Sequence, residues 1–496
     1  MNGSLPSRKL WAALIVLLGA FVYAIRVTAP TDLESYAQVL NVGYILDLMT
    51  HGHWIVQHDL ENAVMSKPPL HTWLMAPFAA IFGLNRLALT LPSGLSVLAL
   101  ALIVFEFGRR RFGELAGGLA AIAIVLAPTM AKQMTLVRTD PFFTLTVALA
   151  AFAAFLAWER GRAGTRYWML FWFAAALTTL IKGPLGLVLA AGGLLSYLWE
   201  KRSNPELPTL RGPHFAGIAL FLALTLCWFA AAWLSVGQAL IDKMLYSELI
   251  YHAVGEHRGG WQARDLLKPT GFLLARYLPF SIPFVFALWR VFRHPAQDLC
   301  ERRCERFLTC WILSGLLIFS VVKHQRADHV LPLWPACALL AGREMARLAE
   351  RMGKVRFSGV SALVALLLLG SAYSGAHATL GRREGTSDYA QEMKLATDTQ
   401  LAAEAFIAEG LDAGRLYHVD TPITLQLYMG TYRPFIDRKQ LQQILNEADG
   451  PVDVALGKTS VEELKLLERY PGTKRLFRWP TDESQKPIFQ VYRVAR

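Results

Sequence analysis

Two carboxylates and a later lysine mark the two ends of a polar stretch near the start of the chain. Asp32 and Glu34 follow the first apolar segment, and Lys67 precedes two prolines. Acidic side chains at a membrane interface are costly, so they are usually there for function. A carboxylate can accept the proton of an attacking hydroxyl, and a cation can stabilise a phosphate leaving group. These residue types therefore suit a transfer reaction in which a hydroxyl attacks and a phosphate leaves.

Further ionisable side chains occur in loops that follow later apolar segments. Most are cations on the side of the membrane where lysine and arginine are normally scarce. The guanidinium fork of arginine and the ammonium group of lysine suit an anionic ligand, phosphate in particular. The sequence therefore predicts a phosphate-binding surface on this side. Its candidate residues are Lys67, Arg138, Lys182, Arg258, Lys323 and Arg326, and Asp140 and His257 occur in the same outer loops.

Several of these residues also have a structural explanation, and His257 and Arg258 could belong to an ordinary polar loop. Asp32 and Glu34 could cap a helix that begins after Pro30, because the helix dipole stabilises acids at its N-terminus. Asp140 could likewise be an interfacial cap, and Lys67 could simply extend its ammonium group to the membrane surface. A ligand-binding role is favoured over these structural explanations because all of these residues lie on the same side of the membrane in the predicted topology.

That topology follows from composition and loop charge. The chain has 496 residues, of which 54% are hydrophobic and 18% charged, which is typical of a polytopic membrane protein. Its net charge of +12 comes largely from short loops between apolar runs, as the positive-inside rule expects, so no nucleic-acid partner is needed to explain it. None of the five cysteines falls in an outer segment, so no disulfide framework is expected.

The first span is predicted at residues 10–27, with residues 28–83 outside. Within this outer stretch, residues 32–49 read as an amphipathic surface helix, and residues 68–82 are too short for a crossing. The next span, residues 87–107, ends in three consecutive arginines, which mark the cytoplasmic side and fix the parity of the later spans. The pattern then predicts spans at residues 115–128, 141–158, 168–181, 185–199, 215–236, 272–289, 308–322, 330–346 and 357–376. It therefore gives an α-helical membrane domain of about 11–13 spans.

From residue 377 the composition changes to that of a soluble domain, on the same side as Asp32. Helical and strand-like segments alternate to residue 496, which predicts a small α/β domain. The expected helices are residues 391–409, 439–446 and 460–470, and the expected strands are residues 415–419, 452–456, 474–479 and 488–494.

Several motifs, taken in order, resemble those of the aminoarabinose lipid A transferases. These enzymes stand beside the protein O-mannosyltransferases in the C-type superfamily of integral membrane glycosyltransferases, abbreviated GT-C. The resemblance extends over roughly residues 10–350. Its motifs are Asp32-Leu33-Glu34, Lys67-Pro68-Pro69-Leu70-His71, Arg138-Thr139-Asp140-Pro141, Lys182-Gly183-Pro184, His257-Arg258, and Leu331-Pro332-Leu333-Trp334-Pro335.

This resemblance implies roles for individual residues. Asp32 would be the catalytic base, with Glu34 beside it, and Asp140 the second acid of the site. Lys67 would hold the donor phosphate, assisted by the other cations. It also implies a polyprenyl-phosphate sugar donor, no nucleotide cofactor, and an active site on the periplasmic face of a bacterial inner membrane.

Two motifs depart from the family pattern, at three positions. Leu33 and Ser35 replace the Glu and Arg of its Asp-Glu-x-Arg-Tyr motif, and Ser66 replaces an acid that is a candidate metal ligand there. A divalent metal cofactor is therefore left open, with Glu34 and His257 as candidate ligands.

The resulting hypothesis is an inverting glycosyltransferase, since attack opposite the leaving group inverts the anomeric centre. Lipid A or another envelope glycan is the expected acceptor. One alternative is a protein O-glycosyltransferase of the same superfamily. Another is a polyprenyl-phosphate transporter or flippase, which needs cations to bind the head group but no base. A third is an assembly protein that presents the C-terminal domain, which leaves the outer cations unexplained.

Overall fold

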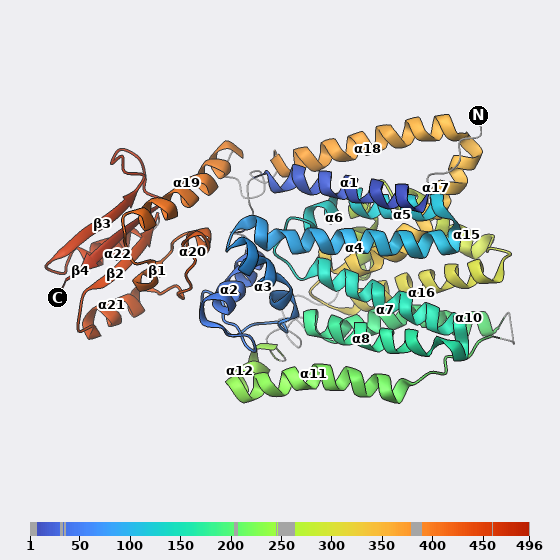
Figure 1. Cartoon of the computed structure of the whole chain (residues 1–496), viewed down its shortest axis with the longest axis horizontal. Coiled ribbons are helices and arrows are strands. Elements are labelled where there is room, and N and C mark those ends of the chain that lie inside the picture. Colours follow the sequence, from blue (N-terminus) through green and yellow to red (C-terminus); the bar gives the residue numbers. More distant parts are fainter. Residues whose placement is uncertain are drawn as a thin grey trace. The chain divides into compact units, whose positions relative to one another are not determined.

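The computed structural model describes residues 7–29, 33, 36–202, 207–244, 246, 263–377, 389–458 and 460–495 (Figure 1). Four predicted site residues, Asp32, Glu34, His257 and Arg258, lie outside the described residues. The described part divides into two compact units that alternate along the chain. The first comprises Met1–Arg26, Ser66–His71 and Leu91–Ser374, and the second comprises Val27–Met65, Thr72–Thr90 and Gly375–Arg496.

The first unit is helical. Its longer helices are apolar runs that end at basic residues or at glycines with positive φ, such as Gly113 and Gly183. The unit contains all or most of α1 (Arg8–Val27), α4 (Arg86–Phe112), α5 (Glu114–Leu126), α6 (Pro128–Gln133), α7 (Asp140–Arg160), η1 (Gly161–Gly164), α8 (Thr165–Lys182), α9 (Leu185–Ala191), η2 (Gly192–Leu195), α10 (Ser196–Lys201), α11 (His214–Val236), α12 (Gln238–Ile241), α14 (Ala263–Arg276), α15 (Ser281–Arg293), α16 (Leu299–Val321), η4 (Ala327–Leu333), α17 (Trp334–Met352) and α18 (Lys354–His377).

Six helical segments of the described chain are long and apolar enough to cross a membrane. They are Arg8–Val27, Arg86–Phe112, the α7–α8 segment Asp140–Lys182, His214–Val236, Leu299–Val321 and Val355–His377. The predicted class, a polytopic helical protein with a small C-terminal α/β part, is confirmed. The count of 11–13 spans stays a prediction, because other expected spans, such as α5, are shorter helices.

Two expected spans are interrupted. Residues 272–289 fall on α14 and α15, which are separate helices, and residues 185–199 fall on α9, η2 and α10. In η2, a Cβ on Gly193 would lie 2.5 Å from the ring of Phe307 in α16. This close approach explains why a glycine is required at this position. Hydropathy alone does not reveal the break and predicts one continuous span at residues 185–199.

The second unit begins with α2 (Tyr36–His51) and contains most of α3 (Leu70–Phe82). The prediction of an amphipathic surface helix at residues 32–49 is wrong, because the described part of this helix is not exposed on one face. Residues 42–48 of α2 are all buried, so apolar and polar positions alike face protein. One cause is the loop that follows, since a Cβ on Gly43 would lie only 3.0 Å from the backbone nitrogen of Leu60.

The C-terminal part of this unit is an α/β fold with a four-stranded sheet in the order β1-β2-β4-β3. The β1 and β2 strands are parallel, and the β2–β4 and β3–β4 pairs are antiparallel. Its elements are α19 (Tyr389–Ala408), η6 (Ala413–Arg415), β1 (Tyr417–Val419), α20 (Ile423–Met429), α21 (Arg438–Glu447), β2 (Val452–Gly457), α22 (Val461–Leu467), β3 (Thr473–Trp479) and β4 (Phe489–Val494).

Helices cover both faces of this sheet. Alternate residues of each strand point to opposite faces, so Ala455 of β2 packs with α19 and α20, whereas Val454 packs with α21 and α22. Phe406 of α19 and Leu441 of α21 are the buried helix residues that anchor the two layers. All predicted strands are present, and α20 is a helix that the sequence reading missed.

Candidate active site

Helices α7 and α8 form a hairpin that brings two predicted residues together. Asp140 is the first residue of α7 and Lys182 is the last residue of α8, and η1 is the short turn between the helices. Since the two helices pack against each other in opposite directions, these ends meet (Figure 1). The Lys182 ammonium group donates to a carboxylate oxygen of Asp140, and both side chains are largely buried.

A second ion pair joins the predicted Arg138 to a residue that the sequence reading did not assign. Nη1 of Arg138 lies 2.8 Å from a carboxylate oxygen of Asp328, in the η4 segment that packs against α7. Asp328 lies two residues after Arg326, so the charged loop at residues 323–329 carried the signal. Only the cations of this loop were considered in the sequence analysis, and the carboxylate was therefore missed.

His71 is a buried neighbour of both pairs. Its ring meets the ring of Phe142 edge-on, with centroids 5.3 Å apart, and it hydrogen-bonds the backbone of Arg138. Burial, followed by the charge of Lys67, lowers the pKa of His71 to about 3, so the imidazole is neutral at pH 7. Its Nε2 is buried and has no hydrogen-bond partner among the described residues, so it is free to meet a ligand.

His329 completes the group from the η4 side. Burial, followed by the charge of Lys182, lowers the pKa of His329 to about 3. Asp140 and Arg326 also act on this imidazole electrostatically. A neutral histidine beside a buried cation adds hydrogen-bonding atoms to the site without adding positive charge.

We call this group the cationic cluster, consisting of Lys67, His71, Arg138, Asp140, Lys182, Arg326, Asp328 and His329. Four of its members are cations and two are carboxylates, so with both histidines neutral these eight described residues carry a net charge of +2. Such an excess in a partly buried site is compensated best by an anionic ligand. Lys323 is exposed, and no contact between it and the cluster is found in the described part of the chain.

The opposite end of the hairpin is also charged, with different chemistry. Arg111, the last of the three arginines near the end of α4, forms an ion pair with Glu159 near the end of α7. With a rise of 1.5 Å per residue, the 21 residues of α7 place this end about 30 Å from Asp140. The basic loops and the cationic cluster therefore lie at the two ends of the hairpin.

The known proteins that are similar to this chain agree with the resemblance found in its motifs. A family model described as dolichyl-phosphate-mannose-protein mannosyltransferase matches residues 66–234. The chain is 28% identical over 373 residues to undecaprenyl phosphate-alpha-4-amino-4-deoxy-L-arabinose arabinosyl transferase 2 of Pseudomonas fluorescens, over 73% of this chain and 64% of that protein. It is 23% identical over 480 residues to the arabinosyl transferase of Erwinia tasmaniensis, over 90% of this chain and 84% of that protein. The resemblance indicated by the motifs is confirmed, although less than two thirds of the Pseudomonas protein is matched.

Solved structures agree at the level of the fold. The structure is similar to that of ArnT from Cupriavidus metallidurans bound to undecaprenyl phosphate, with a TM-score of 0.74, 15% identity and coverage of 99% of both chains. The apo state of the same protein gives a TM-score of 0.69 at 17% identity, over 98% of both chains. The chain therefore shares the fold of these structures over both its helical and its α/β part.

Proposed function

We propose that this protein is an inverting glycosyltransferase that moves a sugar from a polyprenyl-phosphate donor to an envelope acceptor. The observation that carries the proposal is the cationic cluster. It combines an excess of two positive charges with two neutral imidazoles at one end of the α7–α8 hairpin. The shared fold and the names of the sequence relatives support the same reaction class.

The cations act on the leaving group. A polyprenyl phosphate is weakly basic, so its departure needs charge stabilisation more than protonation. Lys67, Arg138 and Lys182 bind the donor phosphate, and Arg258, Lys323 and Arg326 assist from their loops. Nε2 of His71, which forms no hydrogen bond with the residues that the structure describes, is suited to a phosphate oxygen or a sugar hydroxyl.

The carboxylates act on the acceptor and on the cations. Asp32 takes the proton of the acceptor hydroxyl as it attacks opposite the phosphate, which inverts the anomeric centre. Glu34 supports Asp32. Asp140 is the second acid of the site, and its ion pair orients the ammonium group of Lys182.

The site faces the periplasm of a bacterial inner membrane. This placement is supported by the separation of the cationic cluster from the arginines at the far end of the hairpin, since basic loops stay in the cytoplasm. Residues 1–376 form the membrane domain in this proposal, and residues 377–496 form a periplasmic α/β domain. A divalent metal at Glu34 and His257 stays a prediction.

The acceptor is lipid A or another envelope glycan, in keeping with the arabinosyl transferases among the relatives. A protein acceptor is the second candidate. It is favoured by one observation, the match of residues 66–234 to a family described as mannosyltransferases acting on protein.

Mass spectrometry of envelope lipids, glycans and proteins tests the proposal. It compares cells with the wild-type protein, cells with Asp32→Asn at equal protein level, and cells without the protein. We expect one sugar-sized mass to disappear from one acceptor in both altered strains while the polyprenyl-phosphate sugar accumulates. The acceptor that loses the mass separates glycolipid from protein. A wild-type pattern with Asp32→Asn overturns the role of Asp32 and favours a transporter, which binds the phosphate but needs no base.

A further inference from the structure

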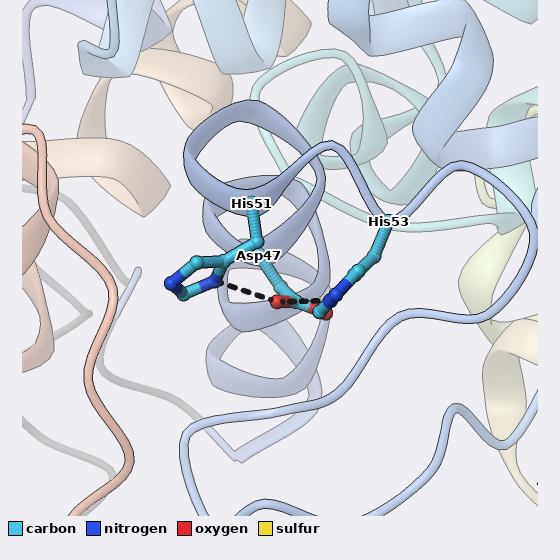
Figure 2. A group of neighbouring side chains, drawn as sticks. All are labelled: Asp47, His51 and His53. Atoms are coloured by element: carbon cyan, nitrogen blue, oxygen red, sulfur yellow. Dashed lines mark hydrogen bonds and ion pairs between the residues drawn. The ribbon is translucent and has the colours of Figure 1, made fainter.

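A second group of ionisable side chains lies at the end of α2, in the other compact unit. Nδ1 of His51 and Nδ1 of His53 lie 3.0 and 2.9 Å from the same carboxylate oxygen of Asp47 (Figure 2). Nδ1 of His58 lies 3.5 Å from the other carboxylate oxygen. We call these four residues the histidine cluster. Their chemistry differs from that of the cationic cluster, because imidazole nitrogens and carboxylates are donors to metal ions.

Local structure brings the three imidazoles to one carboxylate. His51 is one turn after Asp47 on α2, so the two side chains share a helix face. Gly52 then adopts a φ of +70°, which turns the chain so that His53 points back to Asp47. Beyond it, His58 pairs with Val64 in an isolated bridge, and its backbone N–H donates to Asp47 over 2.8 Å.

The loop is held in this shape by bonds that do not involve the imidazoles. The Gln57 side chain donates to the carbonyls of His53 and Trp54, at 2.7 and 3.0 Å, and the Trp73 indole N–H donates to the carbonyl of Trp54 at 2.8 Å. The C-terminal part of the same unit adds two more bonds. The Tyr432 hydroxyl donates to the carbonyl of Asp59 and the backbone N–H of Phe435 donates to that of Leu60. The site is therefore preorganised.

Distances and charge both fit a metal ion. The donor atoms of Asp47, His51 and His53 all lie within 4.8 Å of one another. Ligand bonds of 2.0–2.1 Å in a tetrahedral shell require donor atoms about 3.3 Å apart, and the three distances to Asp47 bracket that value. Only 1% of the Asp47 side chain is exposed. Burial raises the pKa of Asp47, but hydrogen bonds from His58 and His51 outweigh this, and the pKa is lowered overall.

We propose that the histidine cluster binds a divalent transition-metal ion, with Zn²⁺ favoured by the nitrogen-rich donor set. Asp47, His51 and His53 are the three primary ligands, and His58 or a water takes the fourth position. The backbone N–H of His58 orients the carboxylate from outside the first coordination sphere. The ion fastens the loop at residues 52–65 to α2. This site is separate from the metal candidates Glu34 and His257, and it does not depend on the proposed glycosyl transfer.

Metal content of the purified full-length protein tests the proposal. The protein carries a tag without histidines and is stripped with EDTA, loaded with Zn²⁺, desalted, and measured by elemental mass spectrometry. We expect the double variant His51→Ala/His53→Ala to hold one Zn²⁺ fewer per chain than the wild type. The matched control is His294→Ala, an exposed histidine outside the cluster, and it should keep the wild-type content. Equal content in the wild type and the double variant overturns the proposal, as does a wild type that holds none.

A second measurement separates loss of ligands from loss of folding. Loading the wild type with Co²⁺ should give the intense visible bands of a tetrahedral nitrogen and oxygen site, and Zn²⁺ should raise Tm in a saturable way. His53→Gln keeps a polar side chain in the loop, and we expect it to weaken Zn²⁺ binding by at least about tenfold, since one ligand of a chelate is lost. A Tm that responds neither to EDTA nor to Zn²⁺ shows instead that the imidazoles only hydrogen-bond Asp47, and the proposal then fails.

Discussion

Two buried aspartates of this chain lie near helix ends and have opposite surroundings. Asp140 begins α7 and pairs with the ammonium group of Lys182, close to Arg138 and its partner Asp328. Asp47 lies one turn before the end of α2 and is surrounded by three imidazoles. Desolvation penalises the charge of each carboxylate, but different neighbours compensate it.

The difference decides which ligand each site can bind. Lysine and arginine remain charged, so the cations around Asp140 exceed the carboxylates and the remaining charge suits a phosphate. Imidazole nitrogens offer lone pairs to a metal ion instead, and the carboxylate of Asp47 supplies the negative charge for a cation. The neighbours of an aspartate, more than the aspartate itself, therefore determine its chemistry.

The largest effect is expected from Lys182→Met. This change removes a phosphate-binding cation and leaves the Asp140 carboxylate buried without its ion-pair partner, at a cost of about 3–5 kcal/mol of folding stability. The double variant Asp140→Asn/Lys182→Met should regain most of that stability because no unpaired charge remains. Transfer activity should fall by about 100-fold or more in both variants. Thermal unfolding and a donor-turnover assay measure the two quantities.

Lys268→Met is the matched control for this pair. Lys268 is exposed and lies 2.6 Å from Asp265, so its removal should change activity and Tm little. If activity returned together with stability in the double variant, Lys182 would have a structural role only, and the contrast between the two aspartates would lose its functional meaning.

A smaller effect is expected from Arg138→Lys, which keeps the charge and loses the planar fork. Nη1 of Arg138 donates to Asp328, and the remaining donors are suited to a phosphate oxygen. We expect a drop of about tenfold in kcat/KM for the lipid-linked donor. Arg415→Lys is the control, because Arg415 forms an exposed ion pair with Asp412 and should tolerate the change. Equal kinetics for both variants would show that Arg138 acts only through its charge.

The two neutral histidines of the cationic cluster make its stability depend on pH. His71 and His329 have pKa values of about 3 in the folded protein, below the ordinary 6.5. Between these values the unfolded chain binds more protons, so stability is complete above pH 6.5 and falls as the pH decreases. The loss is at most about 1.4 kcal/mol per pH unit for each group. The lowered pKa of Asp47 affects the pH dependence of stability only below its ordinary value of 3.8.

Tm measured from pH 7 to pH 5 checks this expectation. His71→Asn should flatten the decrease, since asparagine keeps a donor for the backbone of Arg138 and does not titrate. His294→Asn should keep the wild-type slope, because that histidine is exposed. A slope that is the same in all three proteins would contradict the assignment.

The sequence predicts those parts of the fold that depend on local patterns. Apolar runs and arginine-rich loops locate α4, α7, α8 and α11, and the alternation of helical and strand-like segments locates β2 and β4. Burial of α2 was not predictable in this way, because it depends on a loop that closes over Gly43 from later in the chain. Likewise, the break between α14 and α15 lies inside an apolar run, where hydropathy carries no signal.

Site prediction succeeded and failed for related reasons. Lys182 and Asp140 were found because each is charged beside a proline or glycine at the end of an apolar run, and antiparallel packing then brings them together. Asp328 was missed because it was read as part of a basic loop. His51 and His53 were missed because their common partner, Asp47, is inside a helix, and only the turn at Gly52 brings both rings to it.

The smallest effect is expected from Tyr432→Phe, which tests how the loop of the histidine cluster is held. The hydroxyl donates to the carbonyl of Asp59 over 2.7 Å, while the ring meets His51 edge-on with centroids 5.2 Å apart. Phenylalanine keeps the ring contact and loses the hydrogen bond, worth about 0.5–1.5 kcal/mol. Backbone amides at residues 52–65 should therefore exchange hydrogen up to about tenfold faster in the apo protein, since 1.4 kcal/mol is a factor of ten.

The matched control is Tyr470→Phe. In the wild type, the Tyr470 hydroxyl donates to Asn446 at an exposed position of the same unit. It should leave exchange in residues 52–65 unchanged. Bound Zn²⁺ should suppress most of the effect of Tyr432→Phe, because the ion fixes the loop independently of that bond. If Tyr432→Phe accelerated exchange equally with and without Zn²⁺, the loop would be held by its backbone bonds alone. The histidine cluster would then lack the structural role that distinguishes it from the cationic cluster.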